Sequence, residues 1–151
     1  METDLTPKKK IYSDLPALEK ASDMSAWLKD HKAQAVEVID LAGRGAFTET
    51  LVVATASSAR HAQSLADGVM ALCHEKRYEY LRVDGYTNGQ WVLVDCNDVV
   101  VNIFQKETRE LYRLESLWKV PASKEELQAM ASAADAKEAR DAKDAKEGKQ
   151  E

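Results

Sequence analysis

The chain has 151 residues, 44% of them hydrophobic, which suits one soluble globular domain with a modest core. Its formal net charge of −5 favours a basic protein partner over nucleic acid, since neutralising phosphates needs clustered Lys and Arg. No apolar stretch is long enough to cross a membrane, and no apolar run follows the N-terminal lysines as in a secretory signal. We therefore expect a cytoplasmic protein that contacts no membrane and no specific nucleic-acid sequence.

The N-terminal part predicts a flexible start followed by helix. Residues 1–13 are polar and carry several lysines, so we expect them to be loose. Asp14 precedes Leu15-Pro16, and proline is tolerated in the first turn of a helix. From there to His31, apolar residues recur at helical spacing and predict one or two helices. These apolar positions are Leu18, Met24, Trp27 and Leu28.

The next segment predicts two strands and a helix. Residues 36–41 alternate and are rich in β-branched side chains, which indicates a strand. Residues 50–56 are almost continuously apolar, as in a strand covered on both faces. Ser57 or Ser58 is well placed to cap the helix that follows. Its predicted buried stripe is Ala62, Leu65, Ala66, Val69 and Cys73.

Three more strands and a helix are predicted after Tyr78. The strands are residues 80–85, 91–95 and 99–104. Asn88-Gly89 favours a tight hairpin turn between the first two, and Asn97-Asp98 connects the last two.

A helix is predicted for residues 108–118, with Thr108 as its cap. Leu111, Leu114 and Trp118 share one face of it.

These elements predict an α/β (α+β) fold, a mixed sheet of about five strands with helices packed on it. We expect this domain to span residues 14–120 and to end near Pro121. Residues 121–151 are rich in Ala, Lys, Asp and Glu and have almost no apolar bulk after Met130. We expect a solvated tail there, disordered or transiently helical.

The two cysteines, Cys73 and Cys96, are far apart and form no CxxC pair. This spacing argues against a zinc site and against a disulfide framework. Both cysteines have apolar neighbours, so we expect buried free thiols in a reducing compartment.

The segment TASSARHAQSLAD, residues 55–67, contains the residue types of a nucleophilic or phosphate-handling site. The flanking glycines of a nucleophile elbow are absent, so a serine here is more often a helix cap. His61 falls in the first helical turn, where a neutral imidazole is expected to tie the loop to the sheet. Arg60 could face an anion at the start of the helix or pair with a carboxylate such as Asp95, and pairing is favoured because no Gly-rich cradle is present. An enzyme that uses Ser57, His61 and Asp95 stays open as an alternative.

Paired carboxylates for a metal are also not evident. Asp95 and Asp98 are three residues apart across a turn, whereas a nucleotidyltransferase needs two carboxylates on one strand face to hold Mg²⁺. We therefore expect no metal, no cofactor and no catalytic residues. The remaining interpretation is a partner-binding surface. Trp91 and Asp95 share one face of their strand, and Asn102 and Phe104 share one face of the next strand.

Several motifs together resemble one known family. TETLVVATASSARHAQSLAD is followed by DG and then by WVLVDCNDVVVNIFQKETRELYRLESLW. In this order they resemble the ribosomal silencing factor family, RsfS, also called Iojap, over residues 33–118. The resemblance implies a non-enzymatic translation regulator whose fold is like a nucleotidyltransferase domain without its catalytic carboxylates.

The resemblance also implies a partner and a mechanism. The family binds the large ribosomal subunit through the large-subunit ribosomal protein numbered fourteen (uL14). Binding blocks joining of the small subunit and lowers translation when nutrients are scarce. A large-subunit assembly role would need the same contact, so it stays open, as does a homodimer. We expect the partner-binding residues to be Trp91, Asp95, Asn102, Tyr112, Glu115 and Trp118, supported by Arg60 and His61.

Four positions depart from the family pattern. Glu49 stands where the family usually has Asp, and Ala56 where it has Gly. Asn97 replaces a Gly in the hairpin, which is a modest change because Asn also tolerates a left-handed backbone. Asn102 stands where a His is common, which weakens any acid–base role, since Asn cannot titrate but still forms hydrogen bonds.

Overall fold

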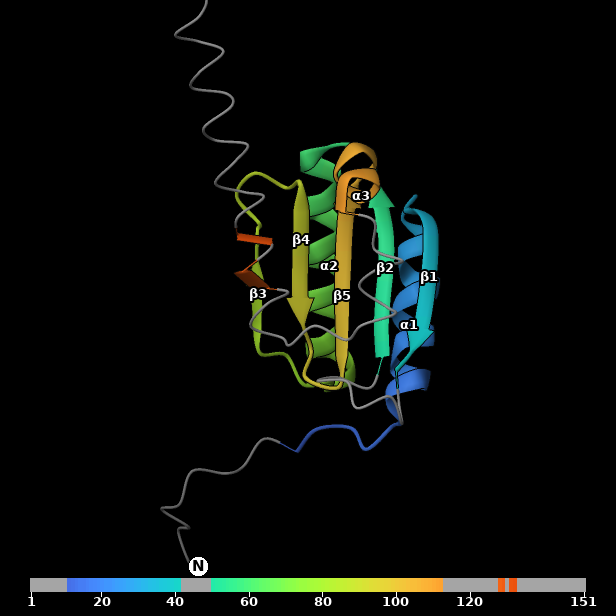
Figure 1. Ribbon diagram of the computed structural model, residues 1–151. Coiled ribbons are helices and arrows are strands. Elements are labelled where there is room, and N and C mark those ends of the chain that lie inside the picture. Colours follow the sequence, from blue (N-terminus) through green and yellow to red (C-terminus); the bar gives the residue numbers. More distant parts are fainter. Residues whose placement is uncertain (1–10, 42–49, 113–127, 130, 133–151) are drawn as a thin grey trace, which may run out of the picture.

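A computed structural model describes residues 11–41, 50–112, 128–129 and 131–132 (Figure 1). Its elements are α1 (Ala17–Asp30), β1 (Gln34–Asp40), β2 (Thr50–Ala56), α2 (Ala59–Lys76), β3 (Arg82–Asp84), β4 (Trp91–Asp95), β5 (Val99–Gln105) and α3 (Lys106–Tyr112). Within these ranges, no helix is both long and apolar enough to cross a lipid bilayer. The expected boundary at Pro121 lies outside the described residues.

The strands form one mixed sheet in the order β1-β2-β5-β4-β3, which confirms the predicted fold class. β2 and β5 are parallel neighbours at its centre, and the other three pairs are antiparallel. Every residue of β2 is buried, as its continuous apolar run predicts. β1 is an edge strand with a largely exposed pattern.

The two long helices, α1 and α2, cover one face of the sheet (Figure 1). The predicted stripe of α2 is buried at all five positions. Met24 and Leu28 of α1 are also fully buried, whereas Leu18 is half exposed. These side chains pack against alternate residues of the central strands, including Val52 and Val101.

The opposite face of the sheet carries a second apolar cluster, which we call the second sheet face. Its members on the strands are Leu51, Val53, Trp91, Leu93, Val100 and Phe104. Leu41 and Ala131 pack against them. Alternation along the strands explains the two clusters, since successive side chains point to opposite faces.

Four described residues of the C-terminal region, 128, 129, 131 and 132, are helical. Ala131 is fully buried in the second sheet face and Gln128 is 8% exposed. At these residues the structure differs from the solvated tail that the composition favours. A small methyl group needs little bulk to pack on an apolar sheet, so composition alone did not reveal this contact.

The start of α3 also differs from the prediction. The helix begins at Lys106, so Thr108 lies inside it and not at its cap. Thr108 Oγ1 instead donates a hydrogen bond to Gln90 Oε1 at 2.8 Å. Leu111, one of the three residues predicted to share a helix face, is 64% exposed. Leu114 and Trp118 lie outside the described residues.

The connection between β3 and β4 is longer than the predicted tight hairpin turn, because β3 ends at Asp84 and β4 begins at Trp91. β3 spans three residues only, and Gly89 N–H donates to the Gly85 carbonyl at 3.3 Å. A methyl group built at Gly89 would lie 2.7 Å from the Ala59 carbonyl oxygen. Gln63 Nε2 donates to the carbonyls of Tyr86 and Thr87 at 2.8 and 3.0 Å. The connection therefore packs closely against the start of α2.

Candidate functional site

The start of α2 is fixed by a serine cap. Ser58 has an extended backbone, and its Oγ accepts a hydrogen bond from the His61 backbone N–H at 3.0 Å. This bond satisfies one of the N–H groups that the first turn leaves unpaired. Of the two predicted capping candidates, Ser58 is therefore the cap.

His61 joins α2 to the end of α1. Ser57 N–H donates to His61 Nδ1 at 3.0 Å, so Nδ1 carries no proton. The proton is then on Nε2, which donates to the His31 carbonyl at 2.9 Å. The predicted hydrogen-bonding imidazole is present, but it ties the loop to α1 and not to the sheet. The reason is that the last carbonyls of a helix need partners from outside it.

The enzyme alternative needs three residues that the fold does not bring together. Ser57 Oγ lies 3.1 Å from His61 Nδ1, so these two do meet. Asp95 pairs in register with Val100, and Val100 with Leu51, six residues before Ser57. At about 3.3 Å per strand residue, Asp95 is roughly 20 Å from that serine along the sheet. A backbone carbonyl, not a carboxylate, orients the imidazole.

Arg60 is exposed, and the expected pairing with Asp95 is wrong. The two residues are at opposite ends of the sheet, because Asp95 lies at the far end of β4 from the start of α2. Arg60 forms no ion pair with another residue of the described ranges.

Trp91 and Asn102 meet on the second sheet face. Trp91 Nε1 donates to Asn102 Oδ1 at 3.1 Å, and each residue is 1% exposed. The Trp91 ring also lies 4.6 Å from that of Phe104, centroid to centroid. Trp91 and Asn102 are thus part of the core on the second sheet face. Of the other expected contact residues, the side chain of Tyr112 and all of Glu115 and Trp118 lie outside the described residues.

The carboxylates of the β4–β5 turn hold the turn and its neighbours. Asp95, 2% exposed, accepts from Asn97 N–H at 2.9 Å and from Gln128 Nε2 at 3.3 Å. Asp98 forms an ion pair of 3.1 Å with Lys20 of α1. No group of three or more His, Cys, Asp or Glu side chains that suits a metal occurs among the described residues.

Arg109 has a role that the sequence did not suggest. Its Nη1 donates to the Ala35 carbonyl and to Thr55 Oγ1, both at 2.7 Å. Ala35 has a φ of +47° in the irregular part of β1, so its carbonyl lies off the regular ladder. An ion pair also links Arg109 to Glu37 at 3.7 Å. One guanidinium thus joins α3, β1 and β2.

The family model that matches this chain is described as ribosomal silencing factor during starvation, RsfS, and the match covers residues 14–151. The chain belongs to the RsfS family. The match reaches further at both ends than residues 33–118, which carry the resemblance in the sequence.

Similar proteins and structures agree with the family. RsfS of Haemophilus influenzae is 30% identical over 79 residues, 52% of this chain and 78% of that protein. RsfS of Halalkalibacterium halodurans is 33% identical over 89 residues, 59% of this chain and 76% of that protein. A crystal structure from Chromobacterium violaceum has a TM-score of 0.63 at 28% identity, covering 71% of this chain and 92% of that one.

A more distant relative carries a different description. It is the mouse protein named mitochondrial assembly of ribosomal large subunit protein 1, 24% identical over 108 residues. The alignment covers 70% of this chain but only 47% of that protein.

Three of the four departures from the RsfS pattern lie in described parts of the structure. Ala56, the last residue of β2, is 3% exposed. Asn97 has a φ of +73°, which fits the expectation that asparagine can replace glycine in this hairpin. Asn102 uses its amide oxygen to hold the Trp91 indole, a role that needs a hydrogen-bond acceptor and no titration.

Proposed function

We propose that this protein is a cytoplasmic ribosomal silencing factor that binds the large ribosomal subunit through uL14. The bound domain occupies space that the small subunit needs, so it blocks subunit association and represses translation under nutrient limitation. The observation that carries the proposal is membership of the RsfS family over residues 14–151. The action is steric and needs no catalytic group, in keeping with the separation of Asp95 from Ser57 and His61.

The proposed contact with uL14 combines buried residues that hold the second sheet face in place with side chains that touch the partner. Trp91 and Asn102 are buried, so we assign them the positioning of the second sheet face. Asp95 fixes the β4–β5 turn beside it. The direct contacts to uL14 are then expected from Tyr112, Glu115 and Trp118. Tyr and Trp are the residue types that dominate protein interfaces.

A charge reversal tests this assignment. Glu115→Arg places a positive charge against a basic partner, and like charges across an interface weaken docking. We expect affinity for purified uL14 to fall by roughly tenfold, as measured by fluorescence anisotropy.

Glu110→Arg is the matched control, because Glu110 is exposed on α3 and the change in net charge is identical. Equal affinities for the two variants would remove Glu115 from the interface.

A second candidate function is assembly of the large subunit, and the mouse relative's name favours it. Both roles use the same contact, so binding alone does not separate them. Cells lacking the protein would accumulate immature large subunits if assembly were its role. Under silencing, their subunits would be mature and joined ribosomes would persist in starvation.

An enzymatic function is the least supported hypothesis, since it rests only on the Ser57–His61 contact. Nucleotide binding measured with and without Mg²⁺ is the inexpensive check. We expect none in either condition.

A further inference from the structure

The two cysteines, separated by 23 residues in sequence, meet in the fold. Cys73 lies in the last turns of α2, and Cys96 follows β4 directly. Their sulfur atoms are 3.6 Å apart, and both residues are free thiols that are 1% exposed. A disulfide bond is about 2.05 Å long, so the sulfurs need to approach by only about 1.5 Å.

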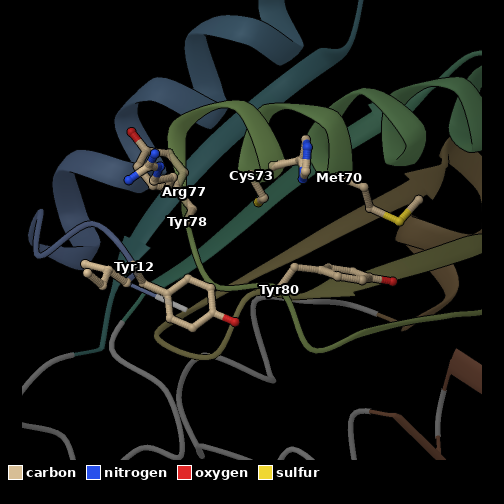
Figure 2. A pocket seen from close by; sticks show the side chains of 8 residues that line it. Tyr12, Met70, Cys73, Arg77, Tyr78 and Tyr80 are labelled. Atoms are coloured by element: carbon tan, nitrogen blue, oxygen red, sulfur yellow. The ribbon is translucent and has the colours of Figure 1, made fainter. Parts of the chain in front are cut away.

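A pocket of about 610 Å³ leads to one of the two thiols. Cys73 lines it together with Met70 and His74 of α2 and with Arg77, which directly follows the helix. Figure 2 shows Cys73 and Met70 extending from α2 toward Tyr12 and Tyr80, whose rings lie across the pocket. Cys96 is not among the lining residues. A small reagent in the pocket would therefore meet Cys73 first.

We propose that Cys73 and Cys96 form an oxidisable dithiol, in which peroxide entering through this pocket oxidises Cys73 and Cys96 then closes an intramolecular disulfide. In the first step the Cys73 thiolate attacks one peroxide oxygen. The O–O bond breaks, hydroxide leaves, and Cys73 becomes a sulfenic acid. In the second step the Cys96 sulfur attacks the Cys73 sulfur, and the sulfenic oxygen leaves as water. Two thiols and one hydrogen peroxide thus give one disulfide and two waters.

The surroundings assign different roles to the two sulfurs. The hydrogen bond with Cys96 lowers the pKa of Cys73 and burial opposes this, while the charges of Lys20 and Asp98, which form an ion pair, act in opposite directions. The same hydrogen bond and burial raise the pKa of Cys96. Cys73 lines the pocket and Cys96 does not, so Cys73 is the thiol that attacks peroxide and Cys96 the one that resolves the product; the direction of the two pKa shifts agrees with this.

Mass spectrometry of the full chain after treatment with hydrogen peroxide tests the proposal. We expect a loss of about 2 Da and, after digestion with trypsin without reductant, a cross-link between peptides 61–76 and 83–106. Reductant should reverse both. Oxidation of Met70, in the first peptide, instead adds about 16 Da and is thereby distinguished.

Two single variants test the order of the steps. In Cys96→Ser the sulfenic acid of Cys73 has no resolving thiol, so dimedone should label Cys73. In Cys73→Ser, Cys96 should be labelled at least roughly tenfold more slowly, since it is buried and is not among the residues that line the pocket. Labelling first at Cys96 would overturn the assignment.

Access is tested by a pair of exposed tyrosines. Tyr80 lines the pocket and is 37% exposed, whereas Tyr86 is 36% exposed and is not among the lining residues. Tyr80→Ala should accelerate disulfide formation, and Tyr86→Ala should leave its rate unchanged. Cross-linking between two chains, or a disulfide that forms only after unfolding in urea, would refute the proposal.

Discussion

The imidazole of His61 holds the junction between α1 and α2 at the level of single atoms. Its Nδ1 accepts from the Ser57 N–H and its Nε2 donates to the His31 carbonyl. His31 in turn places its Nδ1 2.7 Å from the Trp27 carbonyl and stacks on the Trp27 ring at 3.8 Å. Removing the His61 ring therefore leaves a helix end and a loop without their link.

We expect His61→Ala to lower the free energy of unfolding by about 1–2 kcal/mol, because two hydrogen bonds at a partly exposed site are lost. Urea unfolding followed by circular dichroism measures the change. His74→Ala is the control, since His74 is exposed on the same helix and forms no hydrogen bond with described residues. Equal losses for the two variants would show that the His61 link is not stabilising.

Tyr78 and Asp23 form a second contact whose strength depends on pH. The Tyr78 hydroxyl donates to Asp23 Oδ2 at 2.5 Å, and this bond lowers the pKa of Asp23 below its usual 3.8. Burial raises the pKa of Tyr78, so the hydroxyl keeps its proton and remains a donor. A carboxyl whose pKa is lowered by folding contributes stability above its unfolded pKa and loses it as the pH falls through the folded value.

Tyr78→Phe should therefore cost about 1 kcal/mol of unfolding free energy at pH 7, a modest value because Asp23 is partly exposed. The difference from the unsubstituted protein should shrink as the pH falls below 3.8, where Asp23 becomes protonated. Urea unfolding at neutral and acidic pH measures this. Tyr80→Phe, at a partly exposed tyrosine, should change little at either pH, and a Tyr78→Phe loss independent of pH would contradict the account.

At the scale of elements, α1 and α2 approach each other at a glycine. A methyl group built at Gly68 of α2 would lie 1.8 Å from Cη2 of Trp27 in α1. The indole thus packs directly against the helix backbone, and no larger residue fits without moving it.

Gly68→Ala sets two effects against each other. Helix propensity alone predicts a gain of up to about 1 kcal/mol, while overpacking against Trp27 costs about 1–3 kcal/mol. We expect the clash to win and thermal unfolding to occur at a lower temperature. Ser64→Ala, at an exposed position of α2, isolates the propensity effect and should be neutral or slightly stabilising. A more stable Gly68→Ala variant would contradict the close packing.

The elements that the sequence predicted well are those with a strong periodic pattern. The continuous apolar run of β2 predicts a strand buried on both faces, and the apolar stripe of α2 predicts a helix with one buried face. Both predictions are confirmed. The start of α3 was predicted wrongly because threonine is a residue type that often caps helices. In the structure the Thr108 hydroxyl donates a hydrogen bond to Gln90, on another segment. A sequence pattern predicts contacts between residues that are close along the chain, whereas this hydrogen bond joins residues 18 positions apart.

The sequence predicted which residues of the candidate site form polar contacts, but not which partners they contact. His61 was expected to form hydrogen bonds, yet its partner, His31, lies 30 residues away. The contacts of Arg109 span 54 and 74 residues and left no local signal. Arg60 and Asp95 were expected to meet, and the register of β2, β5 and β4 puts them at opposite ends of the sheet.

On the scale of the whole molecule, the sheet divides the protein into two apolar layers. α1 and α2 cover one, and the second sheet face lies on the other side (Figure 1). With a net charge of −5, the molecule suits a basic partner. Its affinity for the large subunit should accordingly fall as ionic strength rises.

The central claim is that the protein binds the large subunit and prevents subunit joining. Sedimentation of purified ribosomal subunits on a density gradient, with and without the protein, tests it most directly. We predict that the protein migrates with the large subunit and that the peak of joined ribosomes is lost. A protein that stays at the top of the gradient at low salt, or that migrates with the large subunit while joining proceeds, would contradict steric silencing.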